Sequence, residues 1–530
     1  MSGDVREGFG RVSRRVGKLF RAVLLASTLA GILTLAVLLV YVANDAFKPL
    51  SADPGWHLTF FLTLVVPTVA VGWWSYRRSY GTLATGLLGT VMPGIAALYA
   101  GGLAALFIDV IPTLVWLSFV VAFAVPLGVA AALRRTDRNV PFLAKLALLL
   151  GTTAGSLLVI PGFVQELPTV PADWMVLVLT LGVPEAFLLG RWLGGRWGQR
   201  AGRIAGAAIL LGSAVGGVVG MATGLGAIPG VALALFAGVP TGIYVAIVLK
   251  ERPERRVGLL LPAVVVAGAL AGELLVGALG FAGPESWVDW GFLTSTVQRA
   301  SDPSAVGIYS GVVGTILLMF VVAAIAVPAG VGAAVYLEEY APDTTLTRII
   351  DVNISNLAGV PSVVYGLLGL GLFVRYAGQP TGTLLVGGAT LALLVFPIVI
   401  ISSREAIRAV PDSARQASYG MGATRWQTVK NVVLPRAFPG ILTGTILALS
   451  RAIGETAPLL VIGAAQVFGV PDSWNSAIGA MPLQLYVWAS TYASPAFYTT
   501  VLAAGIVVLL TAMLSMNSIA IYVRNHYEQR

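Results

Sequence analysis

Residues 404–435 read REAIRAVPDSARQASYGMGATRWQTVKNVVLP and form a polar stretch between two long apolar runs. The chain around it has 530 residues, of which 57% are hydrophobic and only 11% are charged. Soluble proteins carry about 25% charged residues, and an apolar run of about 20 residues is long enough to span a bilayer as a helix. The sequence therefore predicts an all-α polytopic membrane protein that leaves the membrane over residues 403–436.

The composition also excludes several classes of protein. There is no cysteine, which excludes a disulfide scaffold and a cysteine-ligated metal site. The two histidines, His57 and His526, lie far apart, so no histidine-ligated metal site is expected. The basic residues lie between apolar runs and form no stripe interleaved with aromatic residues, which argues against nucleic-acid binding.

The apolar runs predict fourteen membrane spans, eight in the first half and six in the second. Tight turns near Asp109 and near Gly224–Gly226 separate two pairs of them. The predicted spans are 20–43, 56–74, 81–107, 111–133, 143–162, 173–190, 203–222, 227–249, 257–282, 305–336, 352–374, 383–402, 437–465 and 498–523.

Lysine and arginine are distributed unevenly between the two sides of these spans. With a cytoplasmic N-terminus, 29 of the 33 Lys+Arg residues lie on the cytoplasmic side and three on the outside. This bias is what the positive-inside rule predicts. The apolar run from Ala22 to Ala43 exceeds the 7–15 residues of a signal peptide, so we interpret it as a retained span. We expect both termini in the cytoplasm and the protein in the plasma membrane.

The polar stretch 404–435 contains a helix–turn–helix pattern. Pro411, Asp412 and Ser413 predict a helix start, because proline suits the first turn and Asp and Ser cap it. Gly420 and Gly422 predict its end. A second helix is expected to begin at Arg425-Trp426 and to be stopped by Pro435. We therefore expect a surface helix over 411–422, with a stripe of small or apolar residues at Ala414, Ala417, Ser418 and Met421.

The same stretch resembles a known motif. Its residues Gln416-Ala417-Ser418-x3-Gly422-x9-Val432-x-Leu434-Pro435 follow the pattern EAA-x3-G-x9-I-x-LP, with Gln in place of Glu and Val in place of Ile. That pattern is the coupling loop of the permease subunits of bacterial and archaeal ABC importers. The resemblance implies that the following residues contact an ATPase: Pro411, Asp412, Arg415, Gln416, Ala417, Ser418, Gly420, Gly422, Ala423, Trp426, Leu434 and Pro435.

A further run narrows the resemblance. Residues 448–459, ALSRAIGETAPL, are similar to the phosphate-importer permeases of the PstA type, as are residues 335–340, 360–366, 290–294 and 481–488. The similarity covers about residues 257–530. It implies a six-helix type I ABC importer permease core there, with coupling loop 403–436. A basic segment, 1–19, and an extension of about eight spans, 20–249, precede this core.

Two charged residues lie inside the predicted span 437–465. Arg451 and Glu455 are four residues apart and so share one helix face. A charge at the bilayer centre costs about 2.5–3.5 kcal/mol on insertion scales. One interpretation is an ion pair that fixes helix packing. The other is that Arg451 lines the substrate path, where a guanidinium holds phosphate oxygens in a planar fork, with Glu455 orienting it. Thr456, Ser450 and Thr445 lie near enough to add hydroxyl donors.

Active import needs an energy source that this chain lacks. It contains no G-x-x-x-x-G-K-[ST] phosphate loop, so we expect it not to hydrolyse ATP and to bind no cofactor. The resemblance implies an ATPase dimer of the PstB type, a second permease of the PstC type and an extracytoplasmic phosphate-binding protein as partners, besides membrane lipid.

Three other interpretations stay open. The chain could transport another oxyanion, such as molybdate or sulfate, or could be a proton-coupled secondary transporter in which Glu455 carries the proton. The third interpretation is a purely structural membrane scaffold, which would leave Arg451 and Glu455 unexplained.

The other acidic residues have no assigned role in the proposed path. Glu338 and Glu339 are expected to be a solvated helix end. The sequence gives no role to Glu273, Asp109 or Glu185, and it suggests only packing or regulation for the first eight spans.

Overall fold

The computed structural model describes residues 14–135, 142–166, 174–297, 302–464, 470–471, 473–491 and 494–528. Within these ranges the chain is helical apart from turns and one isolated bridge between Thr383 and Ala477. Thirteen of the described helices are long and apolar enough to cross a membrane, or up to fourteen if one bent pair is a single span. The predicted all-α polytopic fold is confirmed.

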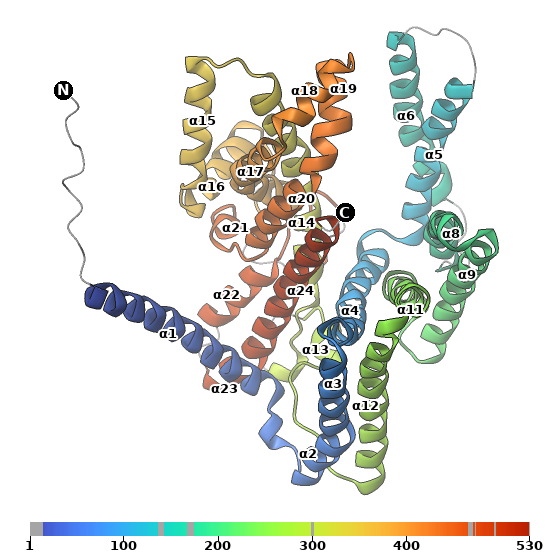
Figure 1. Ribbon diagram of the computed structural model, residues 1–530, viewed down its shortest axis with the longest axis vertical. Coiled ribbons are helices and arrows are strands. Elements are labelled where there is room, and N and C mark those ends of the chain that lie inside the picture. The colour runs from blue at the N-terminus through green and yellow to red at the C-terminus, as the bar shows by residue number, and fades with distance from the viewer. Residues whose placement is uncertain are drawn as a thin grey trace.

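The N-terminal half consists of eight long spanning helices, and a ninth span containing α12 follows them (Figure 1). Several spans combine an α-helix with a wider π-helical turn. The elements are α1 (Arg14–Phe47), η1 (Pro49–Ser51), α2 (Pro54–Phe60), η2 (Phe61–Val65), α3 (Val66–Arg78), α4 (Tyr80–Ala105), η3 (Leu106–Val110), α5 (Thr113–Arg135), α6 (Phe142–Gln165), α7 (Trp174–Leu177), η4 (Val178–Gly182), α8 (Val183–Trp197), α9 (Gln199–Ala222), α10 (Ala227–Ala232), η5 (Leu233–Gly238), α11 (Val239–Glu251), η6 (Pro253–Leu259) and α12 (Leu260–Leu279).

The C-terminal half contains three central helices, α14, α17 and α20, with shorter elements around them. Its elements are α13 (Trp290–Thr294), η7 (Pro303–Ala305), α14 (Tyr309–Val335), η8 (Tyr336–Tyr340), α15 (Thr345–Ala358), α16 (Ser362–Gly369), η9 (Leu370–Tyr376), α17 (Leu384–Arg408), α18 (Asp412–Gly420), α19 (Arg425–Thr428), η10 (Val429–Val433), α20 (Leu434–Ile453), α21 (Ala457–Val461), α22 (Met481–Thr491), α23 (Pro495–Phe497), η11 (Tyr498–Leu502) and α24 (Ala503–Glu528).

Several prolines lie inside these spans without breaking them. A helical proline lacks an N–H group, and its ring clashes with the carbonyl four residues earlier. Here a π-helical turn ends two residues before each of four prolines, namely Pro67, Pro184, Pro240 and Pro435. The wider turn replaces the hydrogen bond that proline cannot make. The prediction that Pro435 stops a separate helix is therefore wrong, since Arg425–Ile453 is one continuous span.

Two predicted spans differ from the structure. The predicted span 352–374 is split into α15 and the α16–η9 segment, which meet at an angle of 107°. The break falls at Gly359-Val360-Pro361, where proline disfavours the helical conformation of the residue before it. The span predicted at 437–465 lies earlier in the chain, because its helix runs over Arg425–Ile453 and only the five-residue α21 follows.

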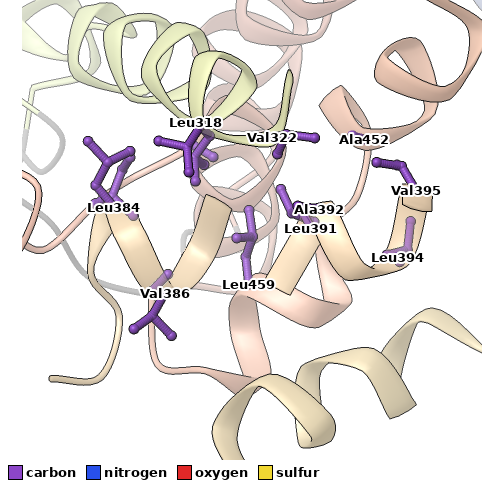
Figure 2. Close-up of a cluster of buried hydrophobic side chains, with 14 of the residues drawn as sticks. Leu318, Val322, Leu384, Val386, Leu391, Ala392, Leu394, Val395, Ala452 and Leu459 are labelled. Atoms are coloured by element: carbon purple, nitrogen blue, oxygen red, sulfur yellow. The ribbon is translucent and has the colours of Figure 1, made fainter. Parts of the chain in front are cut away.

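The core of the molecule lies between α14, α17, α20 and α21. Figure 2 shows side chains of α17, including Leu391, packed against Leu318 of α14 and Leu459 of α21. A glycine allows the close approach of α14 and α17, because a Cβ atom at Gly388 would overlap the side chain of Val321. This tight packing holds the ends of α14 and α17 in fixed positions.

The N-terminal helices are joined to this core at few places. Helix α1 packs along α24, and α4 contacts α14. The segment before α13 is hydrogen-bonded to the turn before α2. There the Ala282 amide donates to the Asp53 carboxylate at 2.6 Å, and the Trp287 amide donates to the Ala46 carbonyl at 2.8 Å.

Candidate functional site

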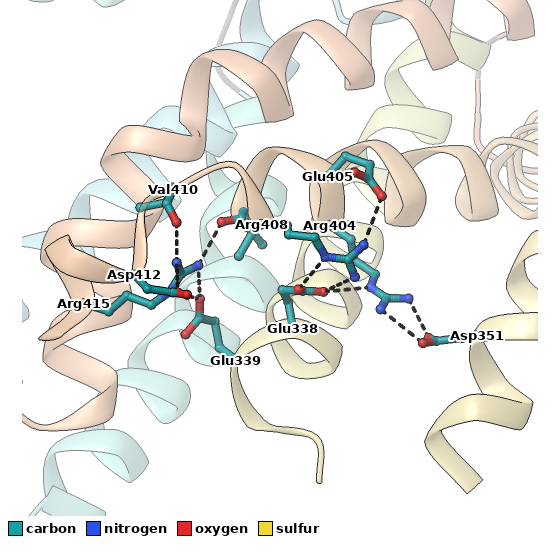
Figure 3. A network of polar contacts seen from close by, with 10 residues as sticks. Glu338, Glu339, Asp351, Arg404, Glu405, Arg408, Val410, Asp412 and Arg415 are labelled. Carbon is teal, nitrogen blue, oxygen red and sulfur yellow. Dashed lines mark hydrogen bonds and ion pairs between the residues drawn. The ribbon is translucent and has the colours of Figure 1, made fainter. Parts of the chain in front are cut away.

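The short helix α18 lies at one end of the molecule, beside the ends of α14 and α17 (Figures 1 and 3). Its C-terminal end is set by Gly422, whose φ of 81° is a conformation that glycine adopts without strain. Pro411 is the N-cap, and no side chain caps the helix. The predicted capping by Asp412 and Ser413 is therefore wrong. The Asp412 carboxylate instead accepts a hydrogen bond from Arg415 at 3.1 Å.

The surface of α18 and the turn after it is largely open. Gln416, Ala417 and Gly420 are exposed, and Met421 and Trp426 expose 88% and 58% of their surface. Of the predicted stripe, Ala417 and Met421 point outward, whereas Ser418 lies half-buried with its hydroxyl 2.9 Å from that of Thr428. Exposed apolar side chains on a polar segment are typical of a protein contact surface.

The predicted second helix begins where expected. Thr424 caps it, and the side chain of Gln427 accepts a hydrogen bond from the Thr424 amide at 2.8 Å, which completes a capping box. The helix then continues through η10 into α20 without a stop. Any force on α18 therefore reaches α20 through one short turn and a continuous helix.

Arg415 fixes the base of α18 to the rest of the protein. Its guanidinium donates to the Glu339 carboxylate at 3.0 and 3.1 Å and to the carbonyl oxygen of Ile407 at 2.9 Å (Figure 3). It also donates to the carbonyl oxygen of Val410. The side chains of Arg415 and Glu339 are only 15% and 6% exposed. This buried ion pair joins α18 directly to η8, at the end of α14.

A second group of ion pairs continues from the same turn. Glu338 accepts hydrogen bonds from Arg404 at 3.3 Å and from Arg408 at 2.9 Å, both on α17. Arg404 also donates to Asp351 of α15 at 2.5 Å. Three helices that are distant in the sequence are thus tied together beside α18. We call the set Glu338, Glu339, Asp351, Arg404, Arg408 and Arg415 the charged brace.

The expectation that Glu338 and Glu339 form a solvated helix end is wrong. Both carboxylates are mostly buried and paired, because η8 turns them toward α17 and α18. The sequence held one weak signal for this, since Arg404 and Arg408 are four residues apart and lie on the same helix face. Their shared acidic partner, Glu338, lies 66 residues from Arg404 and 70 residues from Arg408, which is beyond the reach of any local sequence pattern.

Arg451 lies in the last turn of α20 rather than mid-span. Helix α20 ends at Ile453, and Glu455 lies in the following turn. Arg451 Nε is still 3.4 Å from Glu455 Oε1, and the two side chains are 47% and 16% exposed. Within the described residues, Glu455 is the only hydrogen-bond partner of the Arg451 guanidinium. Its other guanidinium donors have no hydrogen-bond partner among the described residues.

The nearby hydroxyl groups have different partners. Thr456 is the N-cap of α21, where its side chain makes no capping bond. Ser450 donates to the carbonyl of Ile446 at 2.9 Å and lies 2.6 Å from the side-chain oxygen of Asn517 on α24. The Thr445 hydroxyl is buried and has no hydrogen-bond partner among the described residues. Only Thr456 of these three lies beside Glu455.

The remaining sequence candidates form no second site. No group of three or more His, Cys, Asp and Glu side chains lies close enough to hold a metal ion in the described part of the chain. His57 stacks edge-on against Trp56, with ring centroids 5.3 Å apart. Glu273 is exposed on α12, and Glu185 lies in the first turn of α8. The side chains of His526 and Asp109 lie outside the described residues.

Comparison with known proteins gives one family. Residues 326–526 match the family described as binding-protein-dependent transport system inner membrane component. The chain is 34% identical over 231 residues to the probable ABC transporter permease protein YqgI of Bacillus subtilis, a match covering 43% of this chain and 78% of that protein. It is 30% identical over 250 residues to the phosphate transport system permease protein PstA of Yersinia pestis, covering 44% and 82%.

Other similarities are less complete. The chain is 37% identical over 181 residues to the phosphate transport system permease protein PstA 1 of Mycobacterium tuberculosis H37Rv, which covers 34% of this chain and 58% of that protein. A solved structure of an inward-facing conformation of the MetNI methionine ABC transporter aligns with 41% of this chain and 94% of its own, at 20% identity and a TM-score of 0.31. That score is too low to place individual residues.

Proposed function

Since the chain belongs to the family of binding-protein-dependent transport system inner membrane components, we propose that it is the permease subunit of an ATP-driven importer of inorganic phosphate. Two observations support phosphate over other solutes. Relatives at 30–37% identity are named phosphate permeases, and an arginine with free donors lies at the end of α20. In this proposal the chain is a multi-pass protein of the plasma membrane with both termini in the cytoplasm.

The observation that carries the proposal is the exposed helix α18 on its charged brace. A docking surface must be open to its partner and stiffly connected to the helices it moves. Gln416, Ala417, Met421 and Trp426 provide the open surface, and the Arg415–Glu339 pair provides the connection. We infer that an ATPase dimer binds here and that its closure moves α14, α17 and α20 together. Gln416 offers an amide where the family pattern has a carboxylate.

Arg451 is the proposed contact for the anion. A guanidinium presents donors in a plane that matches two phosphate oxygens. Glu455 engages Nε and leaves the other donors free. Its negative charge also prevents permanent retention of the anion, because a transported ion must leave as readily as it enters. Thr456 would add a hydroxyl donor beside them.

The remaining parts of the importer must come from other chains. This subunit supplies half of the path in the proposal, and a second permease of the PstC type supplies the other half. An ATPase dimer of the PstB type hydrolyses ATP, and an extracytoplasmic binding protein delivers phosphate. The subunit itself is then no enzyme and binds no cofactor.

Uptake of radiolabelled phosphate tests this function. The gene is deleted and restored in its native host, and uptake is measured at low external phosphate with excess molybdate or sulfate as competitor. We expect uptake to fall on deletion, to return on restoration, and to be reduced only by unlabelled phosphate. Competition by molybdate or sulfate would instead identify another oxyanion permease. Uptake that survives ATP depletion and collapses with a proton ionophore would identify a proton-coupled transporter.

A further inference from the structure

A groove runs along one face of the α8–α9 hairpin. The hairpin lies well apart from α17 and α18 (Figure 1). Its volume is about 780 Å³. Its floor is formed by glycines, because the two helices approach so closely that a Cβ atom at Gly202 would come within 2.7 Å of the Gly194 Cα atom. The walls are apolar, with Val183 and Phe187 on α8 and Leu210 on α9. From Val183 to Gly195 the groove is about 18 Å long at 1.5 Å per helical residue.

Two arginines line the end of the groove next to the hairpin turn. They are Arg191 on α8 and Arg203 on α9, and Gln199 lies beside them. No acidic residue lines the groove. Neither arginine forms an ion pair within the described part of the chain. The groove therefore has an apolar trough and a cationic end.

The other basic residues of the hairpin behave differently. Arg196 donates from two nitrogens to Glu251, which neutralises it. Arg200 is exposed and does not line the groove. The Lys250 Nζ atom lies 4.8 Å from the centre of the Trp197 ring. Trp192 and Trp197 are both in the last turns of α8, so their aromatic rings lie at the level of the arginines. Tryptophans at a helix end are typical of the membrane–water interface, so the cationic end lies at headgroup depth.

We propose that this groove binds one anionic phospholipid, with the phosphate on Arg191 and Arg203 and an acyl chain along the glycine floor. Basic pockets between membrane helices on the cytoplasmic side are suited to anionic headgroups. A free phosphate ion would use the two arginines but would leave the apolar trough empty. A zwitterionic lipid would fill the trough but would bring a cationic group near two unpaired arginines. The occupant that satisfies both parts is an anionic lipid.

Lipid binding to the purified, delipidated full-length protein tests this site. Native mass spectrometry measures binding of phosphatidylglycerol and of phosphatidylcholine with the same acyl chains. We expect phosphatidylglycerol to bind more tightly. Arg191→Gln and Arg203→Gln should each weaken it about fivefold, and Arg200→Gln is the matched control that should not. The charge-retaining Arg191→Lys and Arg203→Lys should keep most of the binding.

The groove itself is tested by filling it. A Cβ atom at Gly195 meets nothing within 4 Å, so Gly195→Leu adds a side chain at the cationic end of the groove without disturbing the hairpin. We expect it to reduce phosphatidylglycerol binding at unchanged charge and unchanged elution on size exclusion. Glycerol phosphate, which has the headgroup but no acyl chain, should not displace the lipid.

Four results would overturn the proposal. The first is equal binding of the two lipids, which means that the groove holds only unselected lipid. The second is equal loss of binding in the Arg200→Gln control and the groove variants. The third is displacement of the lipid by glycerol phosphate, which makes this an anion site without a lipid. Absence of any bound lipid would also contradict it.

Discussion

Helix α17 buries 67% of its most apolar stretch inside the chain, whereas α1 buries none of it. The same contrast holds between the two halves. In the spans that contain α14, α20 and α24, 33–44% of the most apolar stretch is buried inside the chain. In the spans that contain α2 to α12, the buried share is 6–22%. The C-terminal half thus makes its own core, and the N-terminal half presents most of its apolar side chains outward, to lipid or to other chains.

Ion pairs between helices are likewise more numerous in the C-terminal half than in the N-terminal half, among the described residues. The charged brace joins α14, α15, α17 and α18 in the C-terminal half. In the N-terminal half, the described residues hold one ion pair between separate helices, Arg196–Glu251. Buried ion pairs hold their helices in fixed relation only while both partners are present. In the proposed function, this braced C-terminal half carries transport.

The largest effect is expected at the end of α20. Arg451→Gln removes the guanidinium charge proposed to contact phosphate, and we expect uptake to fall about a hundredfold, since loss of one partner of a charged pair costs about 3 kcal/mol. The protein should still assemble in the membrane. The matched control is Arg375→Gln, an exposed arginine on η9 that should retain normal uptake. Normal uptake by Arg451→Gln would remove this residue from the path.

A somewhat smaller effect is expected at the charged brace. Glu339→Gln and Arg415→Gln each leave a buried group unpaired, and breaking a buried pair costs about 3–5 kcal/mol. We expect ATP hydrolysis by the purified complex to continue while phosphate uptake falls at least about tenfold. The control is Glu405→Gln, whose side chain is 67% exposed. The double variant Glu339→Arg with Arg415→Glu should recover part of the uptake, and failure of both single variants to change uptake would contradict the role of the brace.

The difference in packing predicts a moderate effect on stability. Leu391 of α17 is fully buried and Leu38 of α1 is 55% exposed. Leu391→Ala leaves a cavity and should lower the free energy of unfolding by about 2 kcal/mol, whereas Leu38→Ala should change it by less than about 0.5 kcal/mol. Thermal unfolding of the two purified variants measures this. Equal destabilisation would mean that α1 is as firmly packed as α17.

The smallest effect is expected at the contact of α20 with α24. Asn517→Ala removes the side chain that lies beside the Ser450 hydroxyl. Hydrogen bonds between membrane helices average about 0.6 kcal/mol, and Ser450 keeps its bond to the Ile446 carbonyl. We expect a loss of stability of about that size and no change in uptake. A large loss of uptake would place Asn517 on the substrate path.

The sequence predicts the long helices well, because an apolar run of about 20 residues has only one stable form in a bilayer. It is less informative at helix ends. Pro361 lies at the break between α15 and α16, whereas Pro435 lies inside the continuous span Arg425–Ile453. The proximity of Arg451 and Glu455 follows from their spacing, although the helix ends between them. The charged brace could not be predicted, because its partners are brought together only by the packing of α14 against α17.

In the proposed function, phosphate passes Arg451, Glu455 and Thr456 of the C-terminal half. The chain has no cysteine, so in a Thr456→Cys variant of the assembled importer position 456 carries the only thiol of this subunit, and labelling is measured on this subunit after separation from its partners. A charged, membrane-impermeant thiol reagent should modify it, and phosphate but not sulfate should slow the reaction. Leu38→Cys on α1 is the lipid-facing control and should stay unmodified. Labelling of Thr456→Cys that phosphate does not slow, or no labelling at all, would contradict the account.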